Sequence, residues 1–156
     1  MINQQSAGGV IVKGNKVLLI HWESRNTFEL PKGTIKKNEV KENTAIREVF
    51  EETGYKTKII KLLGKVSFIF DWDDGKKYKK TVWYFLMKLN QEKQFKKSLL
   101  AHEDFETLWL PFEKAIKIAS FGDIKKILHK AQSKVISYSL RVKSNIKLIP
   151  NNKLKN

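Results

Sequence analysis

The chain has 156 residues, a length that suits one ordinary domain and leaves no room for two. Its content of 41% hydrophobic and 11% aromatic residues is typical of a globular protein, and no apolar run approaches the roughly 18 residues that a membrane span needs. The absence of cysteine excludes disulfides, thiolate metal ligands and a cysteine nucleophile, while the net charge of +15 favours partners that carry phosphate.

The positive charge is concentrated towards the end of the chain. No acidic residue follows Asp123, whereas lysine and arginine recur as far as Lys155. Solvated surface lysines would produce the same excess, so charge alone decides little about function. We expect one domain over residues 1–144 and a basic, flexible tail over residues 145–156 that is suited to contact RNA.

The first residues lack the pattern of a secretory signal, and we therefore expect a cytoplasmic protein without a membrane partner.

The first half of the chain predicts a β-hairpin, a loop and one helix. Short β-rich runs at residues 10–13 and 16–21 flank a Gly-Asn pair that suits a tight hairpin turn. Pro31, Gly33 and Asn38 then mark a loop over residues 26–39. In residues 43–54, apolar side chains recur at three and four positions, and the terminal Gly54 is placed to cap a helix.

The second half predicts further strands and helices that interleave without a strict βαβ period. A run rich in β-branched and aromatic residues at 58–70, interrupted near Gly64, and a second run at 80–89 predict another hairpin. The remaining predicted elements are a short strand at 105–110 and helices at 112–119 and 123–136.

Three glutamates, Glu48, Glu51 and Glu52, lie at i, i+3 and i+4 of the first predicted helix and therefore share one face. Like charges at these spacings repel by about a few tenths of a kcal/mol per pair, so we expect a cation to compensate them. Apolar residues on the opposite side would anchor the helix. A solvated acidic face would show the same pattern, and the preceding loop decides between the two interpretations.

The loop and the helix together carry a 23-residue motif, GTIKKNEVKENTAIREVFEETGY. Its two glycines, the loop glutamate and the REV and EE groups have the spacing of the Nudix box, so the chain resembles the Nudix hydrolase family. Tyr55 stands where the box usually has an aliphatic residue. Asn38 stands where glycine is frequent, and asparagine is the next-best residue for a positive φ.

The resemblance implies the Nudix fold, an α+β class in which a mixed β-sheet lies between helices as an α/β/α sandwich. It implies that Glu48, Glu51 and Glu52 are ligands of Mg²⁺, for which Mn²⁺ can substitute, because hard divalent ions prefer carboxylate and phosphate oxygens. The implied reaction is hydrolysis of a nucleoside diphosphate linked to another group, X, with Glu52 or a neighbour such as Glu51 activating water. The other motif residues are Arg47, which would orient the carboxylates, and Gly33, Glu39 and Gly54, which would shape the motif.

Outside the box, most of residues 7–130 resemble the diadenosine polyphosphate hydrolase branch, the asymmetrical diadenosine tetraphosphatases. The segments AGGVIV, LPKG, KKTVWYFL and HEDFETLWLPFEKAIKIASF carry this resemblance, although the branch commonly has histidine where this chain has Thr34. The roles implied are phosphate contacts for Lys32, Lys79 and Lys80, a carboxylate near the metal or a candidate base for Glu103, and an adenine sandwich for Tyr84 and Phe121. Packing in the core or exposure on a lysine-rich turn would suit these residue types equally well.

The leading interpretation is a hydrolase that converts diadenosine tetraphosphate to ATP and AMP. With X changed, the same chemistry fits RNA 5′-pyrophosphate removal, nucleoside triphosphates, ADP-ribose or diphosphoinositol polyphosphates, and the basic C-terminal region makes RNA the most serious of these. A non-catalytic RNA-binding module on a Nudix scaffold is a further alternative, which the intact carboxylates disfavour. The sequence leaves the number of metal ions and the oligomeric state open.

Overall fold

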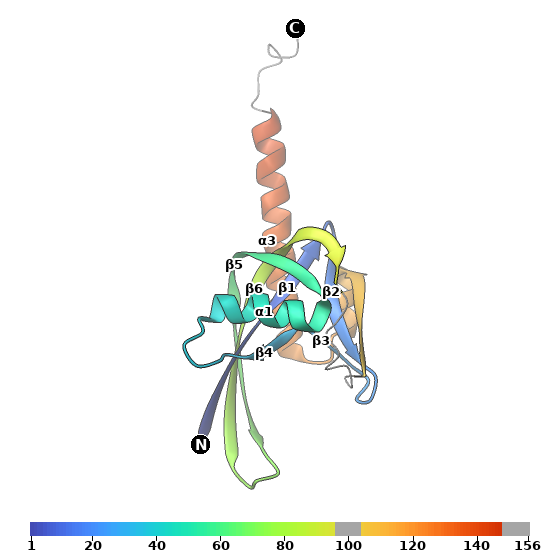
Figure 1. Cartoon of the computed structure of the whole chain (residues 1–156). Helices are drawn as coiled ribbons and strands as arrows, with labels where there is room; N and C mark the ends of the chain where they lie inside the picture. The colour runs from blue at the N-terminus through green and yellow to red at the C-terminus, as the bar shows by residue number, and fades with distance from the viewer. Residues whose placement is uncertain (96–103, 148–156) are drawn as a thin grey trace.

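The computed structural model describes residues 1–95 and 104–147 (Figure 1). The elements are β1 (Ile2–Lys13), β2 (Lys16–Trp22), β3 (Thr27–Glu29), β4 (Lys32–Thr34), α1 (Lys41–Thr53), β5 (Tyr55–Asp71), β6 (Lys77–Gln94), β7 (Phe105–Pro111), α2 (Phe112–Ile118) and α3 (Gly122–Lys147). None of the helices in these residues combines the length and the apolar character that a membrane span requires.

The strands of the described residues form one seven-stranded mixed sheet. Its main path has the order β3-β2-β1-β6-β5, while β4 pairs with β1 and β7 pairs with β2. β1 and β6 run parallel from the pair Ile2–Tyr78 to the pair Val12–Lys88, and the other neighbours are antiparallel. The mixed sheet and its flanking helices confirm the expected α+β class.

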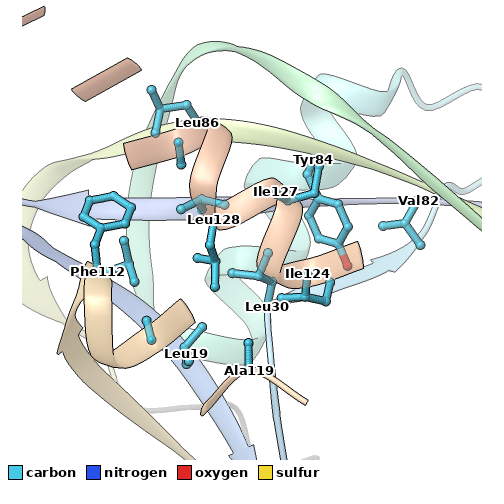
Figure 2. Packing of buried hydrophobic residues seen from close by; sticks show 14 residues of the cluster. Leu19, Leu30, Val82, Tyr84, Leu86, Phe112, Ala119, Ile124, Ile127 and Leu128 are labelled. Carbon is cyan, nitrogen blue, oxygen red and sulfur yellow. The ribbon is translucent and has the colours of Figure 1, made fainter. Parts of the chain in front are cut away.

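Helices cover both faces of the sheet, so the chain forms the expected α/β/α sandwich (Figure 1). On one face, Val49 of α1 packs in a cluster with Phe85 of β6. On the other face, Ile127 and Leu128 of α3 pack with Tyr84 of β6 (Figure 2). Tyr84 and Phe85 serve opposite layers because successive residues of a strand point to opposite faces.

The predicted first hairpin and first helix are confirmed. β1 turns into β2 at Gly14, whose φ is 61°, and Lys13 faces Lys16 across the turn. α1 ends at Gly54, which adopts a φ of 75° and donates its N–H to the carbonyl of Phe50 at 2.8 Å. Glycine suits both positions because a Cβ atom disfavours positive φ.

The β5–β6 hairpin is longer than the sequence predicts. Register shifts around Gly64 confirm the predicted interruption of β5, but β6 runs on to Gln94, which pairs with Tyr55 at the start of β5. The polar end of β6 extends the strand because backbone groups, rather than side-chain alternation, make the ladder. At its other end the hairpin projects beyond the helices together with the first residues of β1 (Figure 1).

α3 is longer than the helix predicted over residues 123–136, because it extends to Lys147 and so passes residue 144, where the domain was expected to end. Its first half packs in the core through Ile124, Ile127 and Leu128. Its second half exposes apolar side chains, including Tyr138 and Leu140. Residues 148–156 lie outside the described residues, so the flexible basic tail stays a prediction.

Leu128→Ala tests the contribution of α3 to the core. Leu128 is fully buried, so removing its side chain is expected to lower the free energy of unfolding by about 2–5 kcal/mol. Leu140→Ala, on the exposed half of the same helix, is the matched control and should change it by less than about 0.5 kcal/mol. Urea unfolding followed by circular dichroism measures both, and equal losses would contradict the observed packing.

Candidate active site

The glutamate face of α1 lies against the short strand β4. A Cβ atom on Gly33 would overlap the carboxylate of Glu48, so any other residue here would displace that carboxylate from its present position. One turn further along α1, Glu52 accepts the backbone N–H of Lys32 at 3.2 Å. β4 is in turn paired with β1, which ties this contact to the middle of the sheet.

Arg47 joins the helix to the preceding loop. Its Nε and Nη2 donate to the two carboxylate oxygens of Glu39 at 2.8 and 2.9 Å, and Nη2 also donates to the carbonyl of Thr34 at 3.0 Å. Its Nη1 donates to Glu48 at 2.7 Å and to Glu51 at 3.2 Å. Arg47 is therefore the compensating cation that the glutamate spacing requires, and its contacts suit the orienting role predicted for it.

Glu39 is the main partner of Arg47 within the loop. Its carboxylate also accepts the hydroxyl of Thr44 at 2.6 Å and the backbone N–H of Lys36 at 3.2 Å. The hydrogen bonds from Arg47, followed by that from Thr44, lower the pKa of Glu39 from 4.5 to about 2. The same pairing raises the pKa of Arg47 above its ordinary value. Asn38, next to Glu39, adopts a φ of 64°, as expected at a position where the motif often has glycine.

The α1 glutamates supply the oxygen ligands that Mg²⁺ prefers, but they do not converge on a preformed cage. Arg47 holds both Glu48 and Glu51, and the side chain of Glu51 is 48% exposed. Within residues 1–95 and 104–147, no group of three or more His, Cys, Asp or Glu side chains is gathered closely enough to hold a metal ion. The donors fit a divalent ion whose coordination is completed by substrate phosphates, with Glu48 and Glu52 one turn apart beside β4.

Lys80 of β6 brings a cation to the same carboxylates. Burial, followed by the nearby charge of Lys32, lowers its pKa, whereas Glu52, Glu29 and Glu48 favour its charged form. The ammonium therefore experiences the repulsion of a second lysine and the attraction of the glutamates. An added phosphate would favour the charged form further, because opposite charge stabilises an ammonium.

The structure does not bring the three predicted phosphate-binding lysines together. Lys79 and Lys80 are neighbours on β6, so their side chains project from opposite faces of the sheet. Lys80 shares a face with Tyr84, whereas the exposed Lys79 shares the other with Trp83. Of the two neighbours, Lys80 is the lysine on which the charges of Glu52 and Glu48 act. The phosphate contact of Lys79 stays a prediction.

The structure contradicts the predicted stacking role of Tyr84. Its ring is 1% exposed and packs in the cluster that contains Ile124 and Ile127, so neither face is open to a base (Figure 2). Burial first, and then the charges of Glu29 and Glu52, raise its pKa. Strand alternation predicts that β6 has two faces. That α3 covers the face carrying Tyr84 is visible only in the folded structure.

The other residues implied by the diadenosine polyphosphate hydrolase branch have different outcomes. Phe121 precedes α3 and is 50% exposed. Its ring is therefore accessible, and its role in stacking on a base stays a prediction. Glu103 lies outside the described residues, and its role as a carboxylate near the metal or a base stays a prediction.

Glu29 is a site residue that sequence reasoning missed. It ends β3, where its carboxylate accepts the hydroxyl of Thr27 at 2.8 Å and Nη2 of Arg25 at 3.1 Å. It is also one of the charges that act on Lys80 and Tyr84. A single glutamate before Leu30 carries no spacing pattern, so only the folded chain, in which its charge acts on Lys80, relates it to the site.

The NUDIX domain model matches residues 3–131 of this chain, which include β4, α1 and the strand that carries Lys80. The chain belongs to the Nudix family. Membership agrees with the α/β/α sandwich and with the contacts that Gly33, Glu39, Arg47 and Gly54 make in the Nudix motif.

Several individual proteins resemble this Nudix chain. A candidate mutator protein, MutT4, of Mycobacterium tuberculosis is 30% identical over 139 residues, which are 81% of this chain and 53% of that protein. An 8-oxo-(d)GTP phosphatase of Mycolicibacterium smegmatis is 28% identical over 116 residues, which are 74% of this chain and 33% of that protein. A binary complex of a C. elegans Ap4A hydrolase has a TM-score of 0.68 and 27% identity, covering 86% of this chain and 98% of that one. The chain thus spans about half or less of the two mycobacterial relatives.

The lowered pKa of Glu39 predicts an acid-sensitive Nudix motif. Because its pKa is lower in the folded chain, its ionised form adds stability that is fully present above pH 4.5 and is lost as the pH falls towards about 2. We therefore expect Glu39→Gln to flatten the fall of the urea midpoint over this range. Glu42→Gln, in the first turn of the same helix, should keep the wild-type profile, and identical profiles for both variants would contradict the role of Glu39.

Gly33→Ala tests the close approach of β4 to the Nudix helix. The added methyl group overlaps the Glu48 carboxylate, so we expect the dissociation constant for Mn²⁺ to rise about tenfold or more, as when a supporting contact of a metal ligand is lost. Electron paramagnetic resonance of free Mn²⁺ measures this without relying on turnover. Gly122→Ala, where a Cβ atom meets open space, is the control, and unchanged affinity in Gly33→Ala would argue against Glu48 as a ligand.

Proposed function

We propose that the chain is a divalent-metal-dependent Nudix pyrophosphohydrolase whose preferred substrate is a dinucleoside polyphosphate, with diadenosine tetraphosphate giving ATP and AMP. One arrangement carries this proposal: Glu48 and Glu52 lie side by side next to β4, where Glu52 accepts the backbone N–H of Lys32, and both glutamates act electrostatically on Lys80. A polyphosphate substrate needs both sets of groups, because carboxylates can hold its divalent ion and lysines can bind its free oxygens.

The residues of the chain divide the reaction between them. Lys32 and Lys80 would bind phosphate oxygens, and Lys80 would stabilise the charge that develops as water attacks phosphorus. A divalent ion, when bound by Glu48, Glu51 and Glu52, would neutralise the polyphosphate and polarise phosphorus. Glu52 would accept the proton of the attacking water while the bond from phosphorus to the bridging oxygen of the departing nucleotide breaks.

Arg47 would act by positioning these groups rather than by touching the substrate. Its hydrogen bonds to Glu39 and to the Thr34 carbonyl hold the guanidinium against the loop before α1. Nη1 is then directed at Glu48 and Glu51. A fixed guanidinium limits the rotation of these carboxylates, which suits the geometry that catalysis requires.

The extent of the likeness to the Ap4A hydrolase supports a dinucleoside polyphosphate as substrate. This chain covers 98% of that hydrolase but only 53% and 33% of the two mycobacterial relatives. Because of the likeness to those relatives, nucleoside triphosphates, including oxidised ones, are the second candidate class of substrate. An RNA 5′ end is a third, supported by the excess of lysine and arginine after Asp123.

A substrate panel tests the proposed activity together with Glu52→Gln. With Mg²⁺, the wild type should convert diadenosine tetraphosphate to ATP and AMP with a higher kcat/KM than 8-oxo-dGTP, 5′-triphosphorylated RNA or ADP-ribose. Glu52→Gln removes the proposed general base, so it should lower kcat by about 10²–10⁴-fold. Glu113→Gln, on α2, is the control for replacing a surface carboxylate. Chromatography identifies the products.

Two results would revise the proposal in different ways. No turnover of any member of the panel would overturn the enzymatic function. A preference of orders of magnitude for RNA or 8-oxo-dGTP would change the identity of X while leaving the phosphate site in place.

A further inference from the structure

The projecting part of the β5–β6 hairpin carries a continuous set of aromatic rings. We call Phe68, Phe70, Trp72 and Tyr78 the aromatic ladder. Phe70 stacks on Tyr78 with ring centroids 5.5 Å apart, and it lies 5.9 Å from Phe68 and 5.8 Å from Trp72. Trp72 also meets Tyr78 at 6.2 Å. These contacts put all the ladder rings on one side of the hairpin.

The aromatic ladder begins beside Lys80, one of the lysines proposed to bind phosphate. In the β5–β6 register, Phe68 lies opposite Lys80, and Phe70 lies opposite Tyr78. Residues opposite each other in a sheet share a face, with Cβ atoms about 5 Å apart. Lys80 is the cation that interacts with Glu48 and Glu52, so the ladder leads outward from that cation along the same face of the sheet.

Hairpin stability does not account for all of the exposed aromatic surface. The cross-strand stacking of Phe70 on Tyr78 stabilises the pair of strands, and Asp74 accepts the Tyr78 hydroxyl at 2.7 Å. Phe68 and Trp72 nevertheless remain 43% and 58% exposed. Large aromatic rings held in place but open to solvent offer flat surfaces on which a base can stack.

The charge around the aromatic ladder suits a phosphorylated ligand. Residues 65–80 contain five lysines and three aspartates, and the aspartates lie within residues 71–74, at the far end from Lys80. A polyphosphate held near Lys80 would thus be attracted to the inner end of the ladder, while its base could extend over the rings. The sequence also contains a signal for this face, because Phe68, Phe70 and Trp72 recur at every second position.

We propose that the aromatic ladder binds the base of the second nucleoside of the substrate, the nucleoside that belongs to X. This inference rests on the proposed function and specifies X as a group that carries a base. Phosphates lie at Lys32 and Lys80, and the base stacks first on Phe68 and then towards Trp72. The ladder provides the open aromatic surface that the buried Tyr84 lacks.

A pair of substrates isolates the contribution of the second base. Diadenosine tetraphosphate and adenosine 5′-tetraphosphate share the same phosphates, but the latter lacks the second nucleoside. In the double variant Phe68→Ala/Trp72→Ala, the ratio of their kcat/KM values should fall about tenfold or more, mainly through KM for diadenosine tetraphosphate, since stacking contributes a comparable factor per base. A ratio equal to that of the wild type would overturn the proposal.

Ile69→Ala is the matched control for the double variant. Ile69 is an exposed apolar residue of the same strand, but it lies opposite Lys79 and therefore projects from the other face. Its replacement should leave the ratio within about twofold of the wild-type value. An equal fall in Ile69→Ala would mean that general disturbance of the hairpin, rather than stacking, lowers the ratio, and would also overturn the proposal.

Direct binding separates failure of the aromatic ladder from failure of the proposed function. In a Glu52→Gln background, diadenosine tetraphosphate should quench tryptophan fluorescence, and Trp72→Phe should remove most of the quenching while preserving affinity measured by calorimetry. Quenching that depends on Trp72 supports the ladder even if the substrate panel identifies another base-bearing X. Turnover of diadenosine tetraphosphate without such quenching would overturn the ladder and leave the proposed function standing.

A second copy of the chain is the competing occupant of this face. Light scattering of the wild type and of Phe68→Ala/Trp72→Ala tests it. A wild-type dimer that becomes monomeric in the variant, with an unchanged substrate ratio, would identify the ladder as an interface between copies and overturn the proposal. The same oligomeric state in both proteins, together with the expected fall in the ratio, would support base binding.

Discussion

The ion pair between Arg47 and Glu39 is the interaction on which the rest of the site depends. It joins a helix to the loop before it, and the same guanidinium also contacts the carboxylates of Glu48 and Glu51. Because the loop continues from β4, the pair also fixes how closely α1 approaches Gly33. The partly buried Arg47 therefore compensates the repulsion between the glutamates of the helix, and it sets the position of the carboxylates that would hold a metal ion.

The site contains opposite charges that do not neutralise one another completely. Arg47 contacts the glutamates from within α1, the backbone N–H of Lys32 in β4 donates to Glu52, and Lys80 of β6 interacts electrostatically with Glu48 and Glu52. Burial lowers the pKa of Lys80, whereas the charges of Glu52, Glu29 and Glu48 favour its ammonium form. Groups held in this way interact more strongly with an arriving polyphosphate and its divalent ion than freely solvated charges do.

β6 connects the core, the phosphate site and the projecting hairpin along a single face. Tyr84 is buried beneath α3, Lys80 lies among the active-site charges, and Tyr78 belongs to the aromatic ladder. These residues share a face because they are separated by even numbers of positions. Their environments differ only because α3 covers the inner part of the strand and leaves the outer part open. The same alternation separates Lys79 from Lys80.

The sequence by itself determined the Nudix motif, the α1 helix and the hairpin turn at Gly14, because these depend on local spacing and backbone preference. It also indicated the mixed α+β fold through the family resemblance. Only the tertiary structure decided that Tyr84 is covered, that Lys79 and Lys80 are divided between two faces, and that Glu29 lies near the site. Those outcomes depend on which helix packs on which face and on pairings between distant strands, and neither is specified by the residues adjacent in the chain.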